Sequence, residues 1–523
     1  MYNRQVQKMT NTEKTTELAN YLRQLNIPEP SNSEERLHVD EIFGTAYFAF
    51  EQLRNAADYS EQHLLMRKSI ERYLKRNINW GLQTEQDFAS DLVIELTQSR
   101  YIKNDSIGLE IIRRINEQAD YYSKVYQHTI RYLNIDKGRL NGWVNQIASA
   151  HFERLIVKQT GARDGFLGFA FRHFGESIRT QEYDQSDSNF QKSLYVAIQR
   201  AILRSDIASV RYQMYNASFF YQQMSPSVFV QMNEEVDEIF RSQLTNKLTR
   251  LVDRNGSAMR VIENLVDLNK DFEKLLADKT ELKRQTEEIL LQRYALVDIR
   301  LRQGIIKSVV FIFITKIFVG VAIEIPYDLL RNGFIDFLPL TLNIVFPPIY
   351  MASLGFAIQK PSVHNLSVVK RNVINTLFDT KQDKQYHLED TGSRWSVVFN
   401  IVYGLTFITS IGLVVYLLRL LGFNIVQATL FFVFLSAVSF FSVRLVDSTK
   451  DYVAVESTIG LRDLVFNIFM TPFIKIGQKL SDTYAQINFI TYILDFAIEM
   501  PLKTSLAFVR EWSQFLQGKR DRL

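Results

Sequence analysis

The stretch VVFNIVYGLTFITSIGLVVYLLRLL, residues 397–421, contains no charged residue before Arg419. It forms most of a segment from Trp395 to Leu421, and a second apolar segment runs from Ile425 to Val446. At about 1.5 Å of rise per residue, each segment is long enough as a helix to cross a hydrocarbon core of about 30 Å. We therefore expect two membrane-spanning helices here.

Two further apolar stretches precede this pair, from Ile305 to Ile325 and from Phe334 to Ile358. The first contains Lys316, and the second contains Asp336 and three prolines. Both have the length of a membrane crossing, so we expect four spans in all, at residues 305–325, 334–358, 395–421 and 425–446. The polar residues leave open whether the first two cross the bilayer completely.

The composition divides the chain of 523 residues into a polar front and an apolar rear, and the hydrophobic content of 46% averages the two. The 61 basic and 57 acidic residues leave a net charge of +4, which is too small to indicate nucleic acid as a main partner. The chain has no cysteine. Disulfides, thiolate nucleophiles and thiolate metal sites are therefore excluded.

The polar front predicts helices. We expect residues 1–33 to form a flexible arm and residues 34–222 to form a cytoplasmic, all-helical domain. Within it, Phe190, Leu194 and Ile198 recur at every fourth residue, which is typical of an amphipathic helix. Because no run of alternating β-branched residues competes, the predicted fold class is all-α.

Residues 223–304 are expected to form a helical stalk. One apolar stripe lies between Val236 and Leu251, and a heptad pattern runs from Val261 to Leu296, with Asn255 and Gly256 between them. The heptad seam is too narrow for a strong homodimeric coiled coil, which favours an intramolecular hairpin. Because no proline lies between Met259 and Ile325, we expect the second arm to continue without interruption into the first span.

The last segment, residues 447–523, shows amphipathic patterns that predict helices lying along the cytoplasmic face of the membrane. Aromatic and basic side chains are the residues that anchor such segments at the level of the lipid headgroups. The anchors expected here are Trp395, Trp512, Arg510, Lys519 and Arg520. Packing of this segment against the soluble domain is the alternative.

Three polar residues in the apolar stretches form a candidate intramembrane site, namely Lys316, Glu324 and Asn343. Charges at that depth cost at least about 2.5 kcal/mol and commonly face protein or water, so these side chains could line an ion or proton path. Alternatively, Lys316 reaches lipid phosphates, in which case replacing it by leucine should be tolerated. In the second stretch, Pro347 and Pro348 predict a break or kink.

Other motifs do not indicate catalysis. The seven histidines are scattered, without the spacing of a metal site, and no nucleophile elbow or phosphate-binding loop is present. The Phe-rich segment from Gly165 to Gly175 predicts a loop packed over a helical core, or else a wedge that enters the membrane interface. We expect neither an enzyme nor a bound cofactor or metal.

The sequence thus predicts a polytopic, all-α membrane protein with a large N-terminal helical domain and a hairpin stalk. Its leading function is that of a scaffold or assembly factor whose helical domain binds a cytoplasmic or membrane protein partner. The rival is an ion channel or transporter gated by the stalk, and a homo-oligomer is compatible with either. The lipid bilayer is the other expected partner.

Charge distribution predicts the orientation. Lysine and arginine gather on three segments, which precede the first span, follow the second and follow the fourth: Arg300, Arg302 and Lys307; Lys360, Lys370, Arg371, Lys381 and Lys384; Arg444, Lys450 and Arg462. The front also lacks the apolar core of a signal peptide. Because basic loops stay on the cytoplasmic side, we expect a multi-pass protein of the inner (plasma) membrane with both termini in the cytoplasm.

This topology can be tested with single cysteines, because the chain has none of its own. Cysteines at Ser362 and Ser513 should react with an impermeant reagent only after the inner face of the membrane has been exposed. Labelling of either position from outside intact cells would contradict the predicted orientation.

Overall fold

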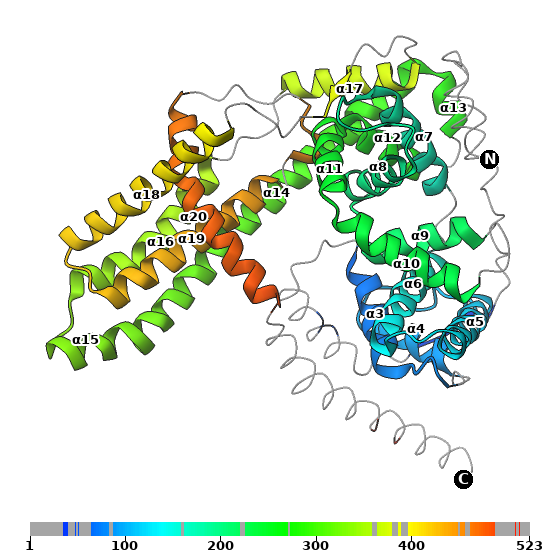
Figure 1. Ribbon diagram of the computed structural model, residues 1–523, viewed down its shortest axis with the longest axis horizontal. Coiled ribbons are helices and arrows are strands. Elements are labelled where there is room, and N and C mark those ends of the chain that lie inside the picture. Colours follow the sequence, from blue (N-terminus) through cyan, green and yellow to red (C-terminus); the bar gives the residue numbers. More distant parts are fainter. Residues whose placement is uncertain are drawn as a thin grey trace. The chain divides into compact units, whose positions relative to one another are not determined.

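The structure, a computed structural model, describes residues 35–39, 48, 51, 64–82, 87–157, 162–219, 225–269, 272–357, 363–378, 385–388, 396–447, 450–454, 461–486, 508 and 512. These residues are almost entirely helical (Figure 1), which confirms the all-α prediction. Two short strands, β1 (Ile178–Arg179) and β2 (Tyr386–His387), pair in parallel, with Ile178 opposite Tyr386. The arm predicted for residues 1–33 lies outside the described residues.

The chain divides into two compact units. One, here called the N-terminal unit, contains Asn20–Glu176 and Tyr183–Val252, and the other, the apolar unit, contains Ser177–Glu182 and Asp253–Ile487. The division at Val252 falls inside the range predicted for the stalk. The hairpin within that range stays a prediction.

The N-terminal unit is built from helices α3 to α11, of which α7 and α11 end slightly beyond its limits. Their bounds are α3 (Leu65–Asn77), α4 (Phe88–Gln98), α5 (Leu109–Tyr132), α6 (Lys137–Val157), α7 (Ala162–Ser177), α8 (Ser188–Ala201), α9 (Ile207–Phe219), α10 (Pro226–Arg241) and α11 (Gln243–Asn255). The start of α10 follows from its sequence, because Ser225 accepts a hydrogen bond from the amide of Val228 and Pro226 occupies the first turn.

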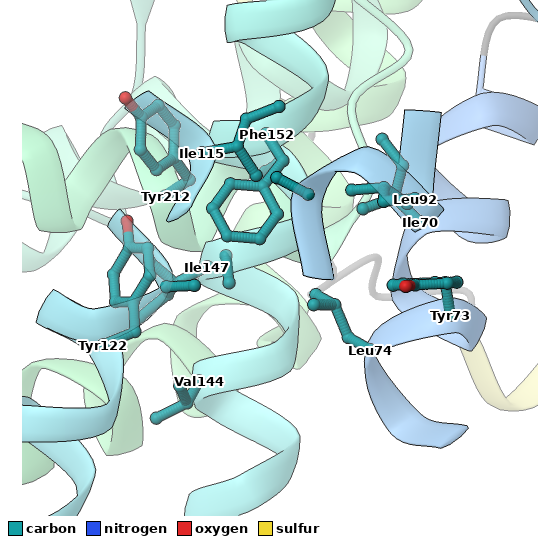
Figure 2. Close-up of a cluster of buried hydrophobic side chains, with 14 of the residues drawn as sticks. Ile70, Tyr73, Leu74, Leu92, Ile115, Tyr122, Val144, Ile147, Phe152 and Tyr212 are labelled. Atoms are coloured by element: carbon teal, nitrogen blue, oxygen red, sulfur yellow. The ribbon is translucent and has the colours of Figure 1, made fainter. Parts of the chain in front are cut away.

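The core of this unit combines aliphatic and aromatic side chains (Figure 2). Ile70 and Leu74 of α3, Leu92 of α4 and Phe152 of α6 are fully buried. Burial of each such side chain stabilises the fold by about 1.5–3 kcal/mol. Trp80 is also buried in this core, and its indole N–H donates to the amide oxygen of Asn145 at 2.8 Å.

The Phe-rich segment predicted to be a loop is part of helix α7. Phe166 and Phe174 are 1% and 0% exposed, so they belong to the interior of the protein. Their burial agrees with the packing that the sequence favoured and leaves neither ring available to enter lipid headgroups.

The apolar unit contains the helices from α12 to α20. Their bounds are α12 (Ser257–Leu268), α13 (Phe272–Ala277), α14 (Lys279–Val319), the π-helical turn η3 (Gly320–Glu324), α15 (Ile325–Asn332), α16 (Phe337–Ala357), α17 (Val363–Phe378), α18 (Ser396–Leu420), α19 (Ile425–Asp447), the 3₁₀ turn η4 (Lys450–Tyr452) and α20 (Leu461–Gln486). Four helical stretches in the described residues are long and apolar enough to cross a membrane, and they contain α14 to α15, α16, α18 and α19.

Helix α14 carries the chain from polar sequence into the first apolar stretch without a break (Figure 1). It begins where the side chain of Asp278 accepts hydrogen bonds from the amides of Thr280 and Glu281. The prediction of one uninterrupted helix from Met259 is wrong, because the chain leaves helical geometry at Asn269 and again at Asp278. Pairing of the heptad as a coiled coil stays a prediction.

Helix α16 continues through Pro347 and Pro348, so the predicted break does not occur there. The irregular turn lies instead in the first apolar stretch, at η3. π-Helical turns of this kind commonly occur at functional sites.

Helix α20 packs closely on α19, and the two helices cross in Figure 1. The contact is made by small residues: a Cβ atom added at Gly477 would come within 2.1 Å of the carbonyl oxygen of Ser436. Phe473 of α20 is also fully buried, stacked on Phe432 at 6.0 Å between ring centroids. The apolar part of α20 thus covers the middle of α19. Its placement along a membrane surface stays a prediction.

In the N-terminal unit, His151 of α6 generates a prediction about pH. The hydroxyl of Tyr122 lies 2.9 Å from its Nδ1, and its ring stacks on that of Tyr212. Burial, with a smaller contribution from the positive charge of Arg154, lowers the pKa of His151 from 6.5 to about 4. The folded protein therefore holds this histidine neutral, as an acceptor for the Tyr122 hydroxyl.

Because the folded pKa lies below the unfolded one, the unfolded chain binds a proton first as the pH falls. Stability should therefore be lost between about pH 6.5 and pH 4, by about 2 kcal/mol between pH 7.5 and pH 5. We expect His151→Gln to flatten this part of the pH dependence of unfolding, measured by thermal or denaturant melts. The exposed His128, changed to glutamine, is the matched control and should leave the dependence intact. An unchanged profile in His151→Gln would contradict the assignment.

Candidate functional site

The three polar residues singled out in the apolar stretches come together in the structure. Lys316 of α14, Glu324 of η3 and Asn343 of α16 are each 0% exposed. The Lys316 ammonium lies 3.0 Å from Glu324 Oε1, and Asn343 Nδ2 donates to Glu324 Oε2 at 2.9 Å. Lys316 therefore forms a buried ion pair and does not extend toward a surface.

The π-helical turn η3 follows α14 and includes Glu324, one of the two members of this ion pair. Its hydrogen bonds span one residue more than those of an α-helix, so it shifts the face on which the following residues lie. Glu324 closes this turn and Asp328 follows four residues later, so both carboxylates lie on the same side of the helix. The ammonium of Lys316 also lies 4.5 Å from the centre of the Phe434 ring of α19, a contact that favours a cation.

A second carboxylate belongs to the same network. Asp328 of α15 is 0% exposed and accepts hydrogen bonds from Asn424 Nδ2 at 2.7 Å and from Gln427 Nε2 at 2.9 Å. Asn343 links the two halves, because its Nδ2 also donates to the backbone oxygen of Gln427 at 3.1 Å. Four helical segments, α14 with η3, α15, α16 and α19, are thus tied together by what we call the buried polar network.

Sequence reasoning missed Asp328, Asn424 and Gln427. One signal was present, since Asn424 and Gln427 have the spacing of a capping box at the start of α19. In the structure, Asn424 Oδ1 accepts from the amide of Gln427 at 2.9 Å, and Gln427 Oε1 accepts from the amide of Asn424 at 3.1 Å. This reciprocal cap holds both amide groups in position to donate to Asp328.

The charges of the buried polar network do not balance. Lys316 and Glu324 neutralise each other, whereas Asp328 has hydrogen bonds only from two neutral amides and no salt bridge within the described residues. Burial of an ionised carboxylate without a partner costs several kcal/mol. In addition, Asn343 Oδ1 is buried and has no hydrogen-bond donor in the described part of the chain.

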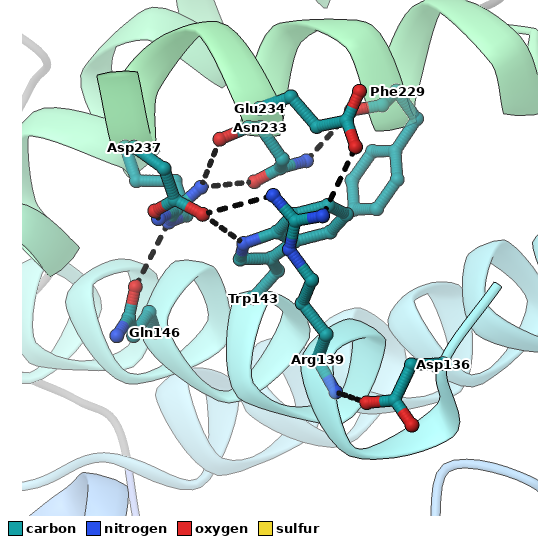
Figure 3. A network of polar contacts seen from close by, with 9 residues as sticks. Asp136, Arg139, Trp143, Gln146, Phe229, Asn233, Glu234 and Asp237 are labelled. Carbon is teal, nitrogen blue, oxygen red and sulfur yellow. Dashed lines mark hydrogen bonds and ion pairs between the residues drawn. The ribbon is translucent and has the colours of Figure 1, made fainter. Parts of the chain in front are cut away.

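A separate polar network stabilises the N-terminal unit (Figure 3). The buried Arg211 of α9 donates to Gln146 Oε1 at 2.8 Å and to the backbone oxygen of Asn233 at 2.9 Å, and it forms an ion pair with Asp237. Trp143 donates its indole N–H to the same carboxylate at 3.0 Å. The network joins α6, α9 and α10.

The charge of Asp237 is stabilised within this second network. Burial raises the pKa of its carboxyl, but Arg211 and the Trp143 N–H outweigh burial and lower the pKa overall. The folded state therefore favours the ionised form of the Asp237 carboxyl.

Of the predicted membrane-interface anchors, the structure describes Trp512. Trp512 is 53% exposed. Trp395, Arg510, Lys519 and Arg520 lie outside the residues that the structure describes. Nor do three or more histidine, aspartate or glutamate side chains meet in a metal-binding arrangement anywhere in that part of the chain.

The buried ion pair changes what is expected of Lys316→Leu. The substitution leaves Glu324 buried without its cation, so we expect it to lower the free energy of unfolding by about 3–5 kcal/mol. The double variant Lys316→Leu/Glu324→Gln removes both charges and should regain most of that loss. Unfolding of the purified chain in mild detergent, by heat or by a denaturing detergent, measures both effects.

Lys475 supplies the matched control. It also lies in an apolar helix, but it is exposed and contacts the ring of Tyr403 at 4.6 Å. Lys475→Leu should cost no more than about 1 kcal/mol. Equal stability of Lys316→Leu and the wild type would show that the pair does not hold the helices together.

The chain was compared with models of protein families, with curated proteins and with solved structures. No family model, no curated protein and no solved structure matches it. The function therefore has to be argued from the residues of the chain itself.

Proposed function

We propose that this chain is a non-enzymatic integral membrane protein that acts as a scaffold or assembly factor. Its apolar unit anchors it in the bilayer, and its N-terminal unit binds a protein partner. The observation that carries the proposal is the buried polar network, whose side chains bond to one another across four helical segments. Such bonds fix the arrangement of helices, which is the property an anchor needs.

Other polar residues of the apolar helices are also engaged locally. The hydroxyls of Thr406 and Thr409 donate to backbone carbonyls of their own helix α18. Ser439 of α19 bonds to the hydroxyl of Tyr350 at 3.0 Å. A conduction path needs polar groups that converge on a shared aqueous route, whereas these hydroxyls are hydrogen-bonded within their own helix or to a neighbouring helix.

A channel or transporter gated by the stalk is the second candidate. It is favoured by the presence of Lys316, Glu324 and Asp328 in apolar helices, since ionisable residues at such sites commonly serve transport. Helix α14 would provide the link for gating, because it runs from polar sequence into the first apolar stretch without interruption. The two candidates differ in whether the chain moves ions.

The proposed location is the inner (plasma) membrane, with several crossings and with both termini in the cytoplasm. Its support is the positive charge of the segments that flank the apolar helices. In this orientation the N-terminal unit faces the cytoplasm, where a protein partner would reach it. Self-association into a homo-oligomer is compatible with the proposal.

Reconstitution separates the two candidates. Liposomes that contain the purified chain should show no ion flux above empty liposomes, because Lys316, Glu324 and Asp328 are bonded to side chains of the helices around them. Lys316→Leu/Glu324→Gln should behave in the same way. A wild-type flux that this double variant abolishes would overturn the scaffold and establish a channel or transporter.

Partner binding can be tested in the cells that produce the chain. A photo-crosslinking amino acid at Tyr132, which is 64% exposed in the N-terminal unit, should give a discrete protein adduct. The same group at Ile408, 71% exposed on the apolar helix α18, should react with lipid and give none. The absence of a protein adduct from Tyr132 and from further exposed positions of the N-terminal unit would contradict the scaffold.

A further inference from the structure

The buried polar network contains one negative charge more than positive charges. Lys316 contributes one positive charge, and Glu324 and Asp328 contribute two negative charges, all on fully buried side chains. Arg331, one turn beyond Asp328, does not neutralise it, because its guanidinium is exposed and donates to the hydroxyl of Tyr327. A region of low dielectric constant disfavours such an imbalance, so the network lacks one positive charge.

An independent observation points to the same deficit. Asn343 Oδ1 is buried and has no donor among the described residues, although Asn343 Nδ2 makes two hydrogen bonds. A buried amide oxygen without a donor or a cation is costly, and buried polar atoms in proteins are rarely left in this state. The unpaired oxygen belongs to the same amide group whose Nδ2 contacts both Glu324 and Gln427.

We propose that the buried polar network binds one small monovalent cation of the Na⁺ type. In this proposal Asn343 Oδ1 and the carboxylate of Asp328 supply ligands, and the side chain of Gln427, which donates to Asp328, and its backbone oxygen, which accepts from Asn343 Nδ2, link the two residues. Carboxylate and carbonyl oxygens suit hard cations, and carbonyl oxygens of membrane helices bind Na⁺ in this way. One positive charge balances the network, whereas a divalent ion would leave an excess.

This cation site belongs to the apolar unit and does not depend on the proposed function as a scaffold. A cation held inside a closed network stabilises the helices around it without crossing the membrane. Absence of flux in liposomes is therefore compatible with the site, and loss of the site would leave the proposed partner binding of the N-terminal unit untouched. The two proposals fail independently.

The first test uses the purified full-length chain in detergent or lipid nanodiscs at constant ionic strength. Replacing choline chloride by NaCl should raise the melting temperature, and the rise should saturate with Na⁺ concentration, since only the folded chain carries the site. Binding of ²²Na⁺ should approach one ion per chain. Equal melting in the two salts, together with no saturable ²²Na⁺ binding, would overturn the proposal.

Variants locate the site. Asp328→Asn keeps the shape of the side chain and removes its charge, so we expect at least a tenfold weaker binding of ²²Na⁺ and no Na⁺-dependent rise in melting temperature. Asp336→Asn is the matched control, because Asp336 lies eight residues further along, hydrogen-bonded to Asn332, and should bind Na⁺ as the wild type does. Full Na⁺ binding by Asp328→Asn would refute the placement of the site.

A proton is the competing source of positive charge. If a proton fills the site, the wild type should respond to pH in choline chloride and not to Na⁺, and Asp328→Asn should lose the pH response. That result would overturn the Na⁺ site. If Asp328→Asn does not fold, the ²²Na⁺ measurement on the wild type still decides the question.

Discussion

A charge enclosed by apolar helices must be matched by an opposite charge nearby, and the apolar unit is organised around that requirement. In α14 and η3, the ion pair between Lys316 and Glu324 supplies the two opposite charges. Asn343 extends the contact to α16 and, through the backbone of Gln427, to α19. Apolar side chains pack with many partners, whereas these donors and acceptors fit only one arrangement. The buried polar network therefore specifies which faces of the helices meet.

The N-terminal unit uses the same physical solution in a different setting. Arg211 is 1% exposed and bonds to three side chains from two other helices. Arg67 is likewise buried and forms ion pairs with Glu71 and Asp206. Around these arginines the core is aliphatic and aromatic, so burial provides most of the stability. The polar contacts set the register of the helices against one another.

The sequence was sufficient to predict the helical class and the four apolar helices, and it singled out Lys316, Glu324 and Asn343, whose side chains are in contact in the structure. Each of these conclusions depends on local composition, because a polar residue in an apolar run is visible within about twenty residues. Asp328 and Gln427 were not found, because their significance arises from a contact between residues 99 positions apart. The continuity of α16 through Pro347 and Pro348 was also missed, since neighbouring helices can compensate for the backbone donors that proline lacks.

Because helix α14 is continuous, the directions in which side chains point at its start and at its end are fixed relative to each other. Leu282 and Ile289 are buried near its start and Lys316 near its end, on one unbroken helix. Inserting a single residue between them would turn Lys316, together with Glu324, by about 100° relative to Ile289, so the start of α14 and the buried polar network could no longer both keep their contacts. An insertion of seven residues would restore the direction to within about 20°. The length of this helix should therefore vary among related chains in steps of whole turns, because a one-residue change would displace either the buried start of α14 or the buried polar network.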